Sequence, residues 1–486
     1  MRKIEKLELA PGFEISRVLT GLWQVADLER DGNTLEPETT AKFMQPYVDA
    51  GFTTFDMADH YGSAEIIAGQ FRNGEPGGKQ AQLLTKWVPK PGAVSKQEVR
   101  AAVQRSLDRM QVEQLDMLQY HAWNYADPAW LDSLFHLMEL KQEGLIAHLG
   151  LTNFDAAHLR VACASGIEIV SNQVSYSLLD QRASGDMTEV CEQYGVNLLA
   201  FGTLAGGFLS EKWLGNPEPA SKQLTTWSQM KYKRFIDTAG GWQPYQQLLG
   251  SLDKIASKYG TSISTVVSRY MLDQPMVGGI ILGARLGQND HIKENLGIFE
   301  LKLDPQDHES IQQAASQLQL IPGDCGDEYR KPPFLTATGD LSDHLESIPR
   351  VFEPVQSDDG KTRVFSGVSW EDFAGYSRAI RSGDRICVSG TTASHGDQLI
   401  GGKDPAAQMH FVIDKIQAAI ESLGGSLEDV ERTRIFVSNI DHWEPVAQAH
   451  GQRFRHIKPV NTLVEAKLVG PEFLLEVEAE AYLRQR

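Results

Sequence analysis

Eight short runs of apolar and β-branched residues constrain the fold of this chain more than any other feature. They are RVLTGLW (17–23), TTFDMA (53–58), QLLTKW (82–87), DMLQYH (116–121), IAHLGLT (146–152), IVSNQVSY (169–176), NLLAFGTL (197–204) and GGIILGA (278–284). Such runs are typical of strands buried on both faces of a parallel sheet, whose connections are usually helices. A strand and a helix repeated eight times predict an α/β fold, the (β/α)8 barrel.

The segments between the runs have helical spacing. In SKQEVRAAVQRSLDRM (95–110), one helix face carries Val99, Val103, Leu107 and Met110. The segment 128–144 repeats this pattern and stops at Gly144, a residue that commonly ends helices. Both segments are therefore predicted to be outer helices of the barrel.

Two other segments interrupt the alternation of strand and helix. Residues 6–15 precede the first strand and predict a short hairpin that plugs the barrel floor. Residues 210–242 are aromatic and rich in turn residues. We expect them to form a long loop over the barrel mouth, next to any bound substrate.

Four polar residues of complementary chemistry follow successive predicted strands, and they are Asp56, Tyr61, Lys86 and His121. The carboxyl ends of barrel strands meet at one face, where such barrels carry their chemistry. An ammonium group beside a phenol makes the phenol a stronger acid, and a carboxylate can hold that ammonium in place. An imidazole can orient a substrate oxygen. The four residues thus form an acid–base set able to protonate a carbonyl oxygen.

Composition limits the partners of the protein. The chain has 486 residues, too many for one ordinary domain, and a net charge of −18 with 64 Asp and Glu against 46 Lys and Arg. Nucleic acid or an anionic membrane would require a basic face. We therefore expect neither as a partner, and we expect a small molecule instead.

Compartment and metal content follow from three absences in the sequence. The start, MRKIEKLELAPG, lacks the apolar core of a secretory signal, and no apolar run approaches the ~18 residues of a membrane span. The four cysteines, at positions 163, 191, 325 and 387, show no metal-ligand spacing. The sequence predicts a soluble cytoplasmic protein with reduced thiols and no metal.

A second domain follows the barrel. Residues 321–350 combine Pro, Gly and charge without periodicity, as linkers do. Beyond them, strands are predicted at 385–391, 432–438, 461–469 and 474–483, and helices at 404–424 and 442–457. We predict a barrel at 1–322, a linker at 323–349 and an α+β domain at 350–486, which is large enough to fold alone.

The first 320 residues resemble the aldo-keto reductases. The resemblance rests on FDMADHYG, LLTKW, YHAW, GLTNF, NQVSY, ILGARL and the pair Glu294-Asn295, which occur in the family's order and spacing. It implies a nicotinamide-dependent reductase of aldehydes or ketones. By this resemblance Tyr61 is the general acid, Lys86 and Asp56 tune it, and His121 positions the carbonyl group.

The resemblance also implies a cofactor site and a substrate pocket. Thr152, Asn153 and Gln173 would hold the nicotinamide carboxamide, and Phe201 would stack against the ring. The other cofactor residues that it implies are Gly21, Leu22, Gly202, Leu204, Gly283, Arg285, His291, Glu294 and Asn295. The substrate pocket would be walled by Trp23, Trp87 and Trp123.

Some of these residues have an alternative structural role. Trp23, Trp87 and Phe201 are also suited to ordinary packing in the barrel. The side chain of Asn153 is also suited to capping the helix predicted to begin near Asp155.

The resemblance favours NADPH as the cofactor. The sequence has no GxGxxG after its first strand, and GTLAGG (202–207) lacks the Lys-Ser/Thr of a phosphate loop, so the barrel mouth must hold the dinucleotide. The resemblance places the 2′-phosphate near Arg285, whose guanidinium can donate two parallel hydrogen bonds. Glu294 and Asn295 would lie at the adenine. His291 stands where many NADPH-preferring members have a second basic residue, so NADH remains a possible cofactor.

The residues from about Arg350 resemble the YjgF/Rid family of small trimeric proteins. GYSRAIRSGDRICVSGTTA, RTRIFVSNIDHWEPVAQAHGQRF and FLLEVEAEAYL carry this resemblance. Archetypal members hydrolyse enamines and imines with an Arg in a P-x-R-S segment. Here that segment is PVNT, and Asn461 lacks the charge and the fork of an arginine, although the family's Glu is present as Glu476. The resemblance implies a homotrimer assembled through this domain.

Together these features predict an NADPH-dependent reductase of an aldehyde or ketone, joined to a Rid-like module for oligomerisation or metabolite binding. The alternative is a cofactor-binding sensor or auxiliary protein. In that case the Rid-like domain is the working module for binding or for enamine and imine chemistry. The complete acid–base set favours the reductase.

Overall fold

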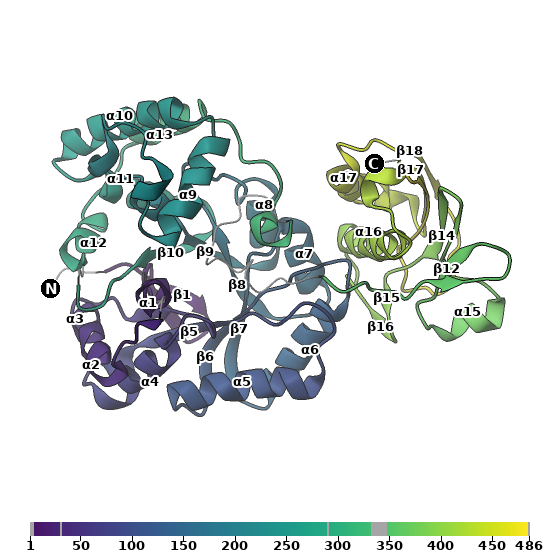
Figure 1. The fold of residues 1–486 in the computed structure, drawn as a ribbon, viewed down its shortest axis with the longest axis horizontal. Helices are drawn as coiled ribbons and strands as arrows, with labels where there is room; N and C mark the ends of the chain where they lie inside the picture. The colour runs from purple at the N-terminus through teal and green to yellow at the C-terminus, as the bar shows by residue number, and fades with distance from the viewer. Residues whose placement is uncertain (1–3, 30–31, 289–290, 332–347, 485–486) are drawn as a thin grey trace.

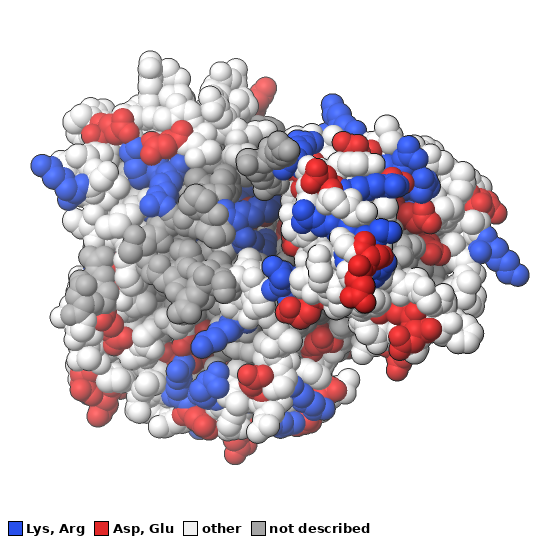
Figure 2. Space-filling model, turned by 45° about the vertical axis from the view of Figure 1, so that its right-hand side comes forward, with Lys and Arg blue, Asp and Glu red and all other residues white. Residues whose placement is uncertain are grey.

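The computed structural model describes residues 4–29, 32–288, 291–331 and 348–484. They form two units, a larger barrel and a smaller α+β domain that lies beside it (Figure 1). In the view of Figure 2, Lys and Arg side chains are interspersed with Asp and Glu over the visible face. Among the helices in the described ranges, none is long and apolar enough to cross a membrane.

Eight parallel strands close into a barrel and confirm the predicted fold class. They are β3 (Val18–Gly21), β4 (Thr54–Asp56), β5 (Gln82–Trp87), β6 (Leu115–Tyr120), β7 (Ile146–Thr152), β8 (Ile169–Ser175), β9 (Asn197–Phe201) and β10 (Val277–Gly283). Neighbours pair in chain order, and β10 closes the circle against β3. Gly21 pairs in register with both Asp56 and Gly283, so the carboxyl ends of these strands lie side by side.

Helices follow the strands and cover the barrel (Figure 1). They are α1 (Trp23–Glu29), α2 (Pro37–Ala41), α3 (Gln45–Asp49), α4 (Ala64–Gly74), α5 (Lys96–Met110), α6 (Ala129–Gln142), α7 (Ala156–Ala164), α8 (Asp186–Tyr194), α9 (Trp227–Thr238), α10 (Trp242–Tyr259), α11 (Ile263–Leu272), α12 (Ile292–Ile298) and α13 (Pro305–Ala315). Helix α5 begins with a capping box between Ser95 and Glu98, which satisfies backbone donors of its first turn. The predicted helices at 95–110 and 128–144 are thus present as α5 and α6.

The predicted hairpin is formed by β1 (Lys6–Ala10) and β2 (Phe13–Ser16), which pair antiparallel. Its side chains Leu9, Phe13 and Ile15 share a buried cluster with residues of the barrel strands, namely Leu19, Leu84, Met117 and Leu199. The hairpin therefore fills the amino-terminal end of the barrel. Only the opposite end remains for a binding site.

The segment 210–242 is not the long loop that its turn residues predicted. It contains the whole of α9, preceded by the short 3-10 turns η5 (Glu211–Trp213) and η6 (Ser221–Gln223). Thr226 caps α9 by accepting a hydrogen bond from the backbone N–H of Gln229. The buried face of the helix carries Tyr232, Phe235 and Ile236. These three apolar residues cover only one helical turn. The Gly, Pro and Ser residues around them therefore made the segment look like a loop in the sequence.

The predicted linker begins with a segment that packs on the barrel. Helix α14 (Asp327–Arg330) is buried at all four residues. The Arg182 guanidinium forms buried ion pairs with Asp180 and with Glu328 of α14, both at 2.8 Å. A chain cut after Leu320 would lose this segment. The predicted linker residues 332–347 lie outside the described residues.

The second domain has the predicted α+β architecture. Its seven-stranded sheet has the order β11 (Val355–Gln356), β12 (Thr362–Val364), β13 (Ala379–Ser382), β14 (Arg385–Thr391), β19 (Leu475–Tyr482), β17 (Val430–Val437) and β18 (Val460–Glu465). The helices are α15 (Ser369–Ala374), α16 (Pro405–Ser422) and α17 (Trp443–Phe454), and β15 (Ser394–His395) pairs with β16 (Gln398–Leu399). Along β19, buried apolar residues alternate with glutamates, so this strand turns its apolar side chains to the core and its carboxylates to the other face of the sheet.

Helix α16 joins the two units. It packs against β14 and β19 of its own sheet and against α7 of the barrel (Figure 1). Most of its residues are buried, including the charged Asp414. Burial of a helix on opposite sides indicates that the second domain is docked on the barrel.

The hairpin generates a stability prediction. Ile15→Ala should lower the free energy of unfolding by about 2–5 kcal/mol, because it opens a cavity in a cluster where Ile15 has no exposed surface. Its exposed neighbour Glu14 provides the control, since Glu14→Ala should cost less than ~0.5 kcal/mol. Denaturant titration followed by circular dichroism measures both. Equal effects would show that the hairpin does not plug the barrel.

Candidate active site

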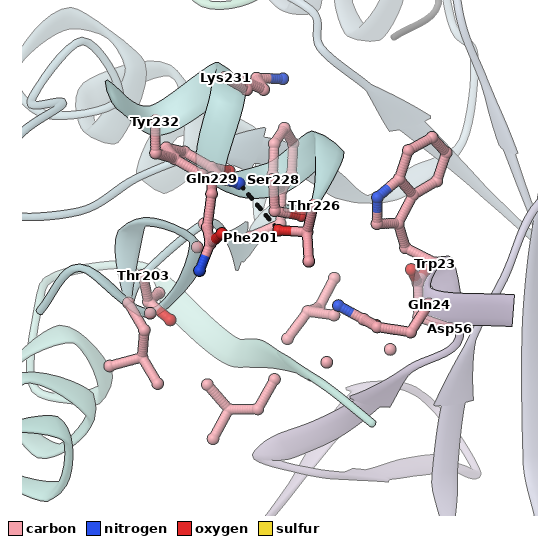
Figure 3. A pocket seen from close by; sticks show the side chains of 18 of the residues that line it. Trp23, Gln24, Asp56, Phe201, Thr203, Thr226, Ser228, Gln229, Lys231 and Tyr232 are labelled. Carbon is pink, nitrogen blue, oxygen red and sulfur yellow. Dashed lines mark hydrogen bonds between the residues drawn. The ribbon is translucent and has the colours of Figure 1, made fainter. Parts of the chain in front are cut away.

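A cavity of about 780 Å³ opens at the carboxyl ends of the barrel strands. Its volume lies in the range of small-molecule and cofactor sites, roughly 300–1,000 Å³. Trp23 and Gln24 line one side, and the other is lined by Thr226, Ser228, Gln229, Lys231 and Tyr232, at the start of α9 (Figure 3). The segment predicted to lie over the mouth is therefore at the cavity, although as a helix.

A buried ion pair lies at the base of this cavity. The Lys86 ammonium donates to Asp56 Oδ2 and to the carbonyl oxygen of Met57, both at 2.7 Å. Each side chain of the pair is only 5% exposed. Burial lowers the pKa of Lys86, and the Asp56 carboxylate opposes this shift by charge and hydrogen bond. Because the Lys86 ammonium lies 4.9 Å from the centre of the Tyr61 ring, three of the four predicted residues are in contact.

Two glutamines hold the second oxygen of Asp56. Gln119 and Gln173 donate to Asp56 Oδ1 at 3.1 and 2.7 Å, and Gln173 also donates to Gln119 Oε1 at 2.8 Å. Gln173 was predicted to hold the cofactor, and Gln119 was not predicted to be part of the site. The position of Gln119 could have indicated its role. It lies two residues before His121, and residues two apart along a strand point to the same face.

His121 follows β6 and has no exposed surface. Its ring centre lies 4.6 Å from that of Trp123 and 5.9 Å from that of Tyr329 in α14, both edge to face. The amide nitrogen of Asn153 is 3.5 Å from His121 Nδ1. The fourth predicted residue thus lies behind the cavity surface, and α14, which the sequence placed in a linker, contributes Tyr329 to that surface.

The predicted cofactor residues also gather at the cavity. All of them line it except Leu22, which is buried beside it and donates its backbone N–H to the carbonyl oxygen of Asp56 at 2.9 Å. Gly283 allows a close approach, since a Cβ there would lie 2.4 Å from Gln24 Nε2. The Oδ1 atom of Asn153 is buried and has no hydrogen-bond partner within the described ranges. A carboxamide is the kind of group that such an atom can accept from.

The three predicted wall tryptophans separate into two groups. Trp23 lines the cavity, with its ring 4.9 Å from Tyr61 and 5.6 Å from Trp227 of α9. Trp87 and Trp123 are buried and are absent from the described cavity lining. Trp87 packs against Tyr120, and the indole N–H of Trp123 donates a hydrogen bond to the carbonyl oxygen of Pro89. The sequence did not single out Trp227 as a wall residue, although the segment 210–242 that contains it was predicted to lie near the substrate.

Asn153 does not cap helix α7. Asp155 occupies the cap position and accepts a hydrogen bond from the backbone N–H of His158. Asn153 instead has a positive φ of 61°, which is uncommon for a residue with a side chain. This conformation points to a constraint on Asn153 other than capping.

The basic residues predicted at the cofactor phosphate each have a carboxylate partner. Arg285 Nη2 lies 2.9 Å from Asp27 Oδ2, and His291 Nδ1 lies 2.7 Å from Glu294 Oε2. The Asp27 side chain is 7% exposed and that of Arg285 is 36% exposed. Asp27 was not singled out from the sequence, because nothing in the residues around it connects it with position 285.

The family comparisons agree with this geometry. The model of the aldo/keto reductase family matches residues 17–316, more than half of the chain, and the chain belongs to that family. The model described as Endoribonuclease L-PSP matches residues 369–483 in the second domain. Both resemblances found in the sequence are confirmed.

Three known proteins illustrate these relationships. The NADH-specific methylglyoxal reductase of Escherichia coli is 24% identical over 63% of this chain and 96% of its own. A glycerol dehydrogenase from Gluconobacter oxydans shares the fold, with a TM-score of 0.54 and 21% identity over 66% of this chain and 97% of its own. A Mycobacterium tuberculosis member of the YjgF/YER057c/UK114 family is 42% identical, covering 25% of this chain and 99% of its own, with a TM-score of 0.24. The family and its reductase members make this protein an NAD(P)H-dependent oxidoreductase.

Proposed function

We propose that the protein reduces an aldehyde or ketone to an alcohol, with NADPH as its preferred cofactor. The observation that carries this proposal is the Lys86–Asp56 ion pair beside Tyr61, because it puts a phenol and a fixed ammonium at the edge of a large cavity. Few structural roles require a lysine, an aspartate and two glutamines to be buried together at the mouth of a barrel.

In this proposal, side chains of the protein supply the proton that the reduction of a carbonyl group requires. Tyr61 donates it to the carbonyl oxygen, and the Lys86 ammonium stabilises the phenolate that forms. Asp56 and its two glutamine partners keep Lys86 in place. His121 orients the oxygen, which requires the surface that covers its ring in the unliganded chain to shift when the substrate binds. A bound nicotinamide supplies the hydride.

The described residues fit a nicotinamide dinucleotide. Thr152 and Asn153 offer polar groups for the carboxamide, and the Oδ1 atom of Asn153 lacks another acceptor role within the described ranges. Phe201 presents an aromatic ring at the same cavity. Arg285, which follows β10, and Glu294 and Asn295 of α12 line the same cavity. We propose that Arg285 binds the 2′-phosphate and that Glu294 and Asn295 lie at the adenine.

The proposed acid gives the first functional prediction. Tyr61→Phe should reduce turnover of a responsive aldehyde or ketone by about 10²–10⁴-fold, the usual contribution of general acid–base catalysis. NADPH binding should persist, because the phenol meets the substrate and not the cofactor phosphates. Steady-state oxidation of NADPH and a fluorescence titration measure the two effects. Tyr259→Phe, on α10 and outside the cavity lining, is the control, and unchanged turnover in Tyr61→Phe would exclude this mechanism.

The Arg285–Asp27 pair gives a prediction about cofactor choice. Arg285→Ala should weaken NADPH binding by roughly ten- to hundredfold, the value of a charge-assisted hydrogen bond, and NADH binding much less. Asp27→Asn should have the opposite effect, because it removes a negative charge beside the proposed 2′-phosphate. Fluorescence titration of each variant with both cofactors tests this. Equal changes for NADPH and NADH would place the phosphate elsewhere.

We propose that the second domain assembles the protein into a homotrimer. The face of its sheet opposite the core exposes apolar side chains, with Val460 62% and Val464 43% accessible. Such residues on a sheet face are candidates for contact with another copy. An enamine-hydrolysing role has less support, since Asn461 donates a hydrogen bond to Thr433 Oγ1 at 2.9 Å and carries no charge for a substrate carboxylate.

Sedimentation equilibrium tests the trimer. The full chain should sediment at three times its mass of 53.9 kDa. Val464→Glu should release monomers, because a buried unpaired carboxylate opposes association. Ile66→Glu, which charges an exposed apolar position on α4 of the barrel, should remain trimeric. A monomeric full chain would refute the proposal.

A further inference from the structure

A continuous row of buried contacts runs from the second domain to the proposed active site. It begins at Asp414 in α16, crosses to His158 in α7, passes through Tyr125 and ends at Arg330 in α14. Every one of these residues is at most 8% exposed. The row therefore lies within the protein along its whole length.

The interface end of the row is an ion network. His158 Nε2 lies 2.9 Å from Asp414 Oδ2, and His158 Nδ1 lies 2.6 Å from Asp155 Oδ1. The Arg453 guanidinium of α17 forms an ion pair with the other oxygen of Asp414, with Nη1 2.7 Å from Oδ1. Burial favours the neutral imidazole, but the two carboxylates outweigh it and raise the pKa of His158. With both nitrogens engaged, the plane of the imidazole ring is fixed.

The fixed ring orients the next two residues. Tyr125 stacks on His158 with ring centres 3.5 Å apart and an interplanar angle of 7°. The Arg330 guanidinium carbon lies 4.4 Å from the centre of the Tyr125 ring, a cation–π contact. In a buried site such a contact gains strength, because water does not compete for the cation.

Arg330 in turn holds the main chain beside His121. Its Nη1 atom donates to the carbonyl oxygens of Asn153 at 2.8 Å and of Ala122, the residue after His121, at 3.4 Å. The segment reaches this place because of Gly326, where a Cβ would lie 2.2 Å from the Asn153 carbonyl oxygen. The positive φ of Asn153 persists only if its surroundings hold it, and Arg330 supplies such a contact.

We propose that the second domain positions the reductase site through this row. Asp414 orients His158 and Tyr125, and they keep Arg330 on the backbone of Asn153 and Ala122. Arg330 and Asp414 are positioning residues, since neither is part of the cavity lining. The inference rests on the proposed function, which gives His121 and Asn153 their roles toward the carbonyl group and the carboxamide.

Other contacts between the domains provide a matched comparison. Arg160 Nε bonds Asp404 Oδ2 at 2.7 Å and so also joins α7 to the start of α16. Within the described ranges, neither residue bonds to Tyr125 or Arg330. Loss of this ion pair weakens the interface without altering the row.

A double-mutant cycle in the full chain tests the coupling. Asp414→Asn and Arg330→Lys should each lower kcat for a carbonyl substrate about tenfold or more. Binding of adenosine 2′,5′-bisphosphate, which lacks the nicotinamide, should stay unchanged. The double variant should be less impaired than the product of the single losses by at least about threefold, the coupling expected of residues in one network. For Arg160→Gln combined with Arg330→Lys, the loss in kcat should instead equal the product of the two single losses. The same multiplicative result for Asp414→Asn combined with Arg330→Lys would overturn the proposal.

Hydrogen exchange provides a readout that does not depend on catalysis. In the unliganded full chain, Asp414→Asn should speed amide exchange in residues 119–124, whereas Arg160→Gln should not. Equal exchange in the two variants would overturn the proposal even if the protein reduces carbonyls. A wild-type chain that neither binds NADPH nor reduces any carbonyl would refute the proposed function alone. If Asp414→Asn fails to fold, Tyr125→Leu interrupts the same row within the barrel, and the same outcomes apply.

Discussion

The buried ion pair between Lys86 and Asp56 is the interaction on which the rest of the site depends. Two charges removed from water are tolerated only where their remaining hydrogen-bonding capacity is satisfied. Here Met57 accepts from Lys86, and Gln119 and Gln173 donate to Asp56. These partners come from β6, β8 and the end of β4, so the closed barrel is needed to assemble them. The hairpin that fills the opposite end keeps the polar cluster at the open mouth.

The segment after the last barrel helix changes the relation between the two domains. Helix α14 places Tyr329 at the cavity and Arg330 on the backbone beside His121. Because Arg330 is connected through Tyr125 and His158 to Asp414, the second domain is physically continuous with the reductase site. Fusion to the second domain would then influence catalysis as well as the assembly that we propose for that domain. A barrel-only chain would need to extend through Lys331 to keep α14.

Charge at the far end of the cavity bears on the choice of cofactor. Arg285 is a suitable partner for a 2′-phosphate, yet Asp27 already offers it a carboxylate. A phosphate at this place would lie close to a negative charge, whereas a ribose hydroxyl would find both a donor and an acceptor. The structure therefore contains features that favour each dinucleotide. One relative of this chain, the methylglyoxal reductase of Escherichia coli, is NADH-specific.

The sequence by itself determined the barrel and the α+β domain, and it is the source of the proposal that Asp56, Tyr61, Lys86 and His121 form an acid–base set. Repeated strand runs and local motifs such as FDMADHYG act over short distances, so they can be recognised in the linear chain. The contacts of Gln119, Asp27, Tyr329 and Arg330 were decided only by the tertiary structure. Each of them meets partners between about 60 and 260 positions away. A local sequence pattern cannot predict contacts between residues so far apart in the chain, because these contacts form only when the barrel closes and α14 docks on it.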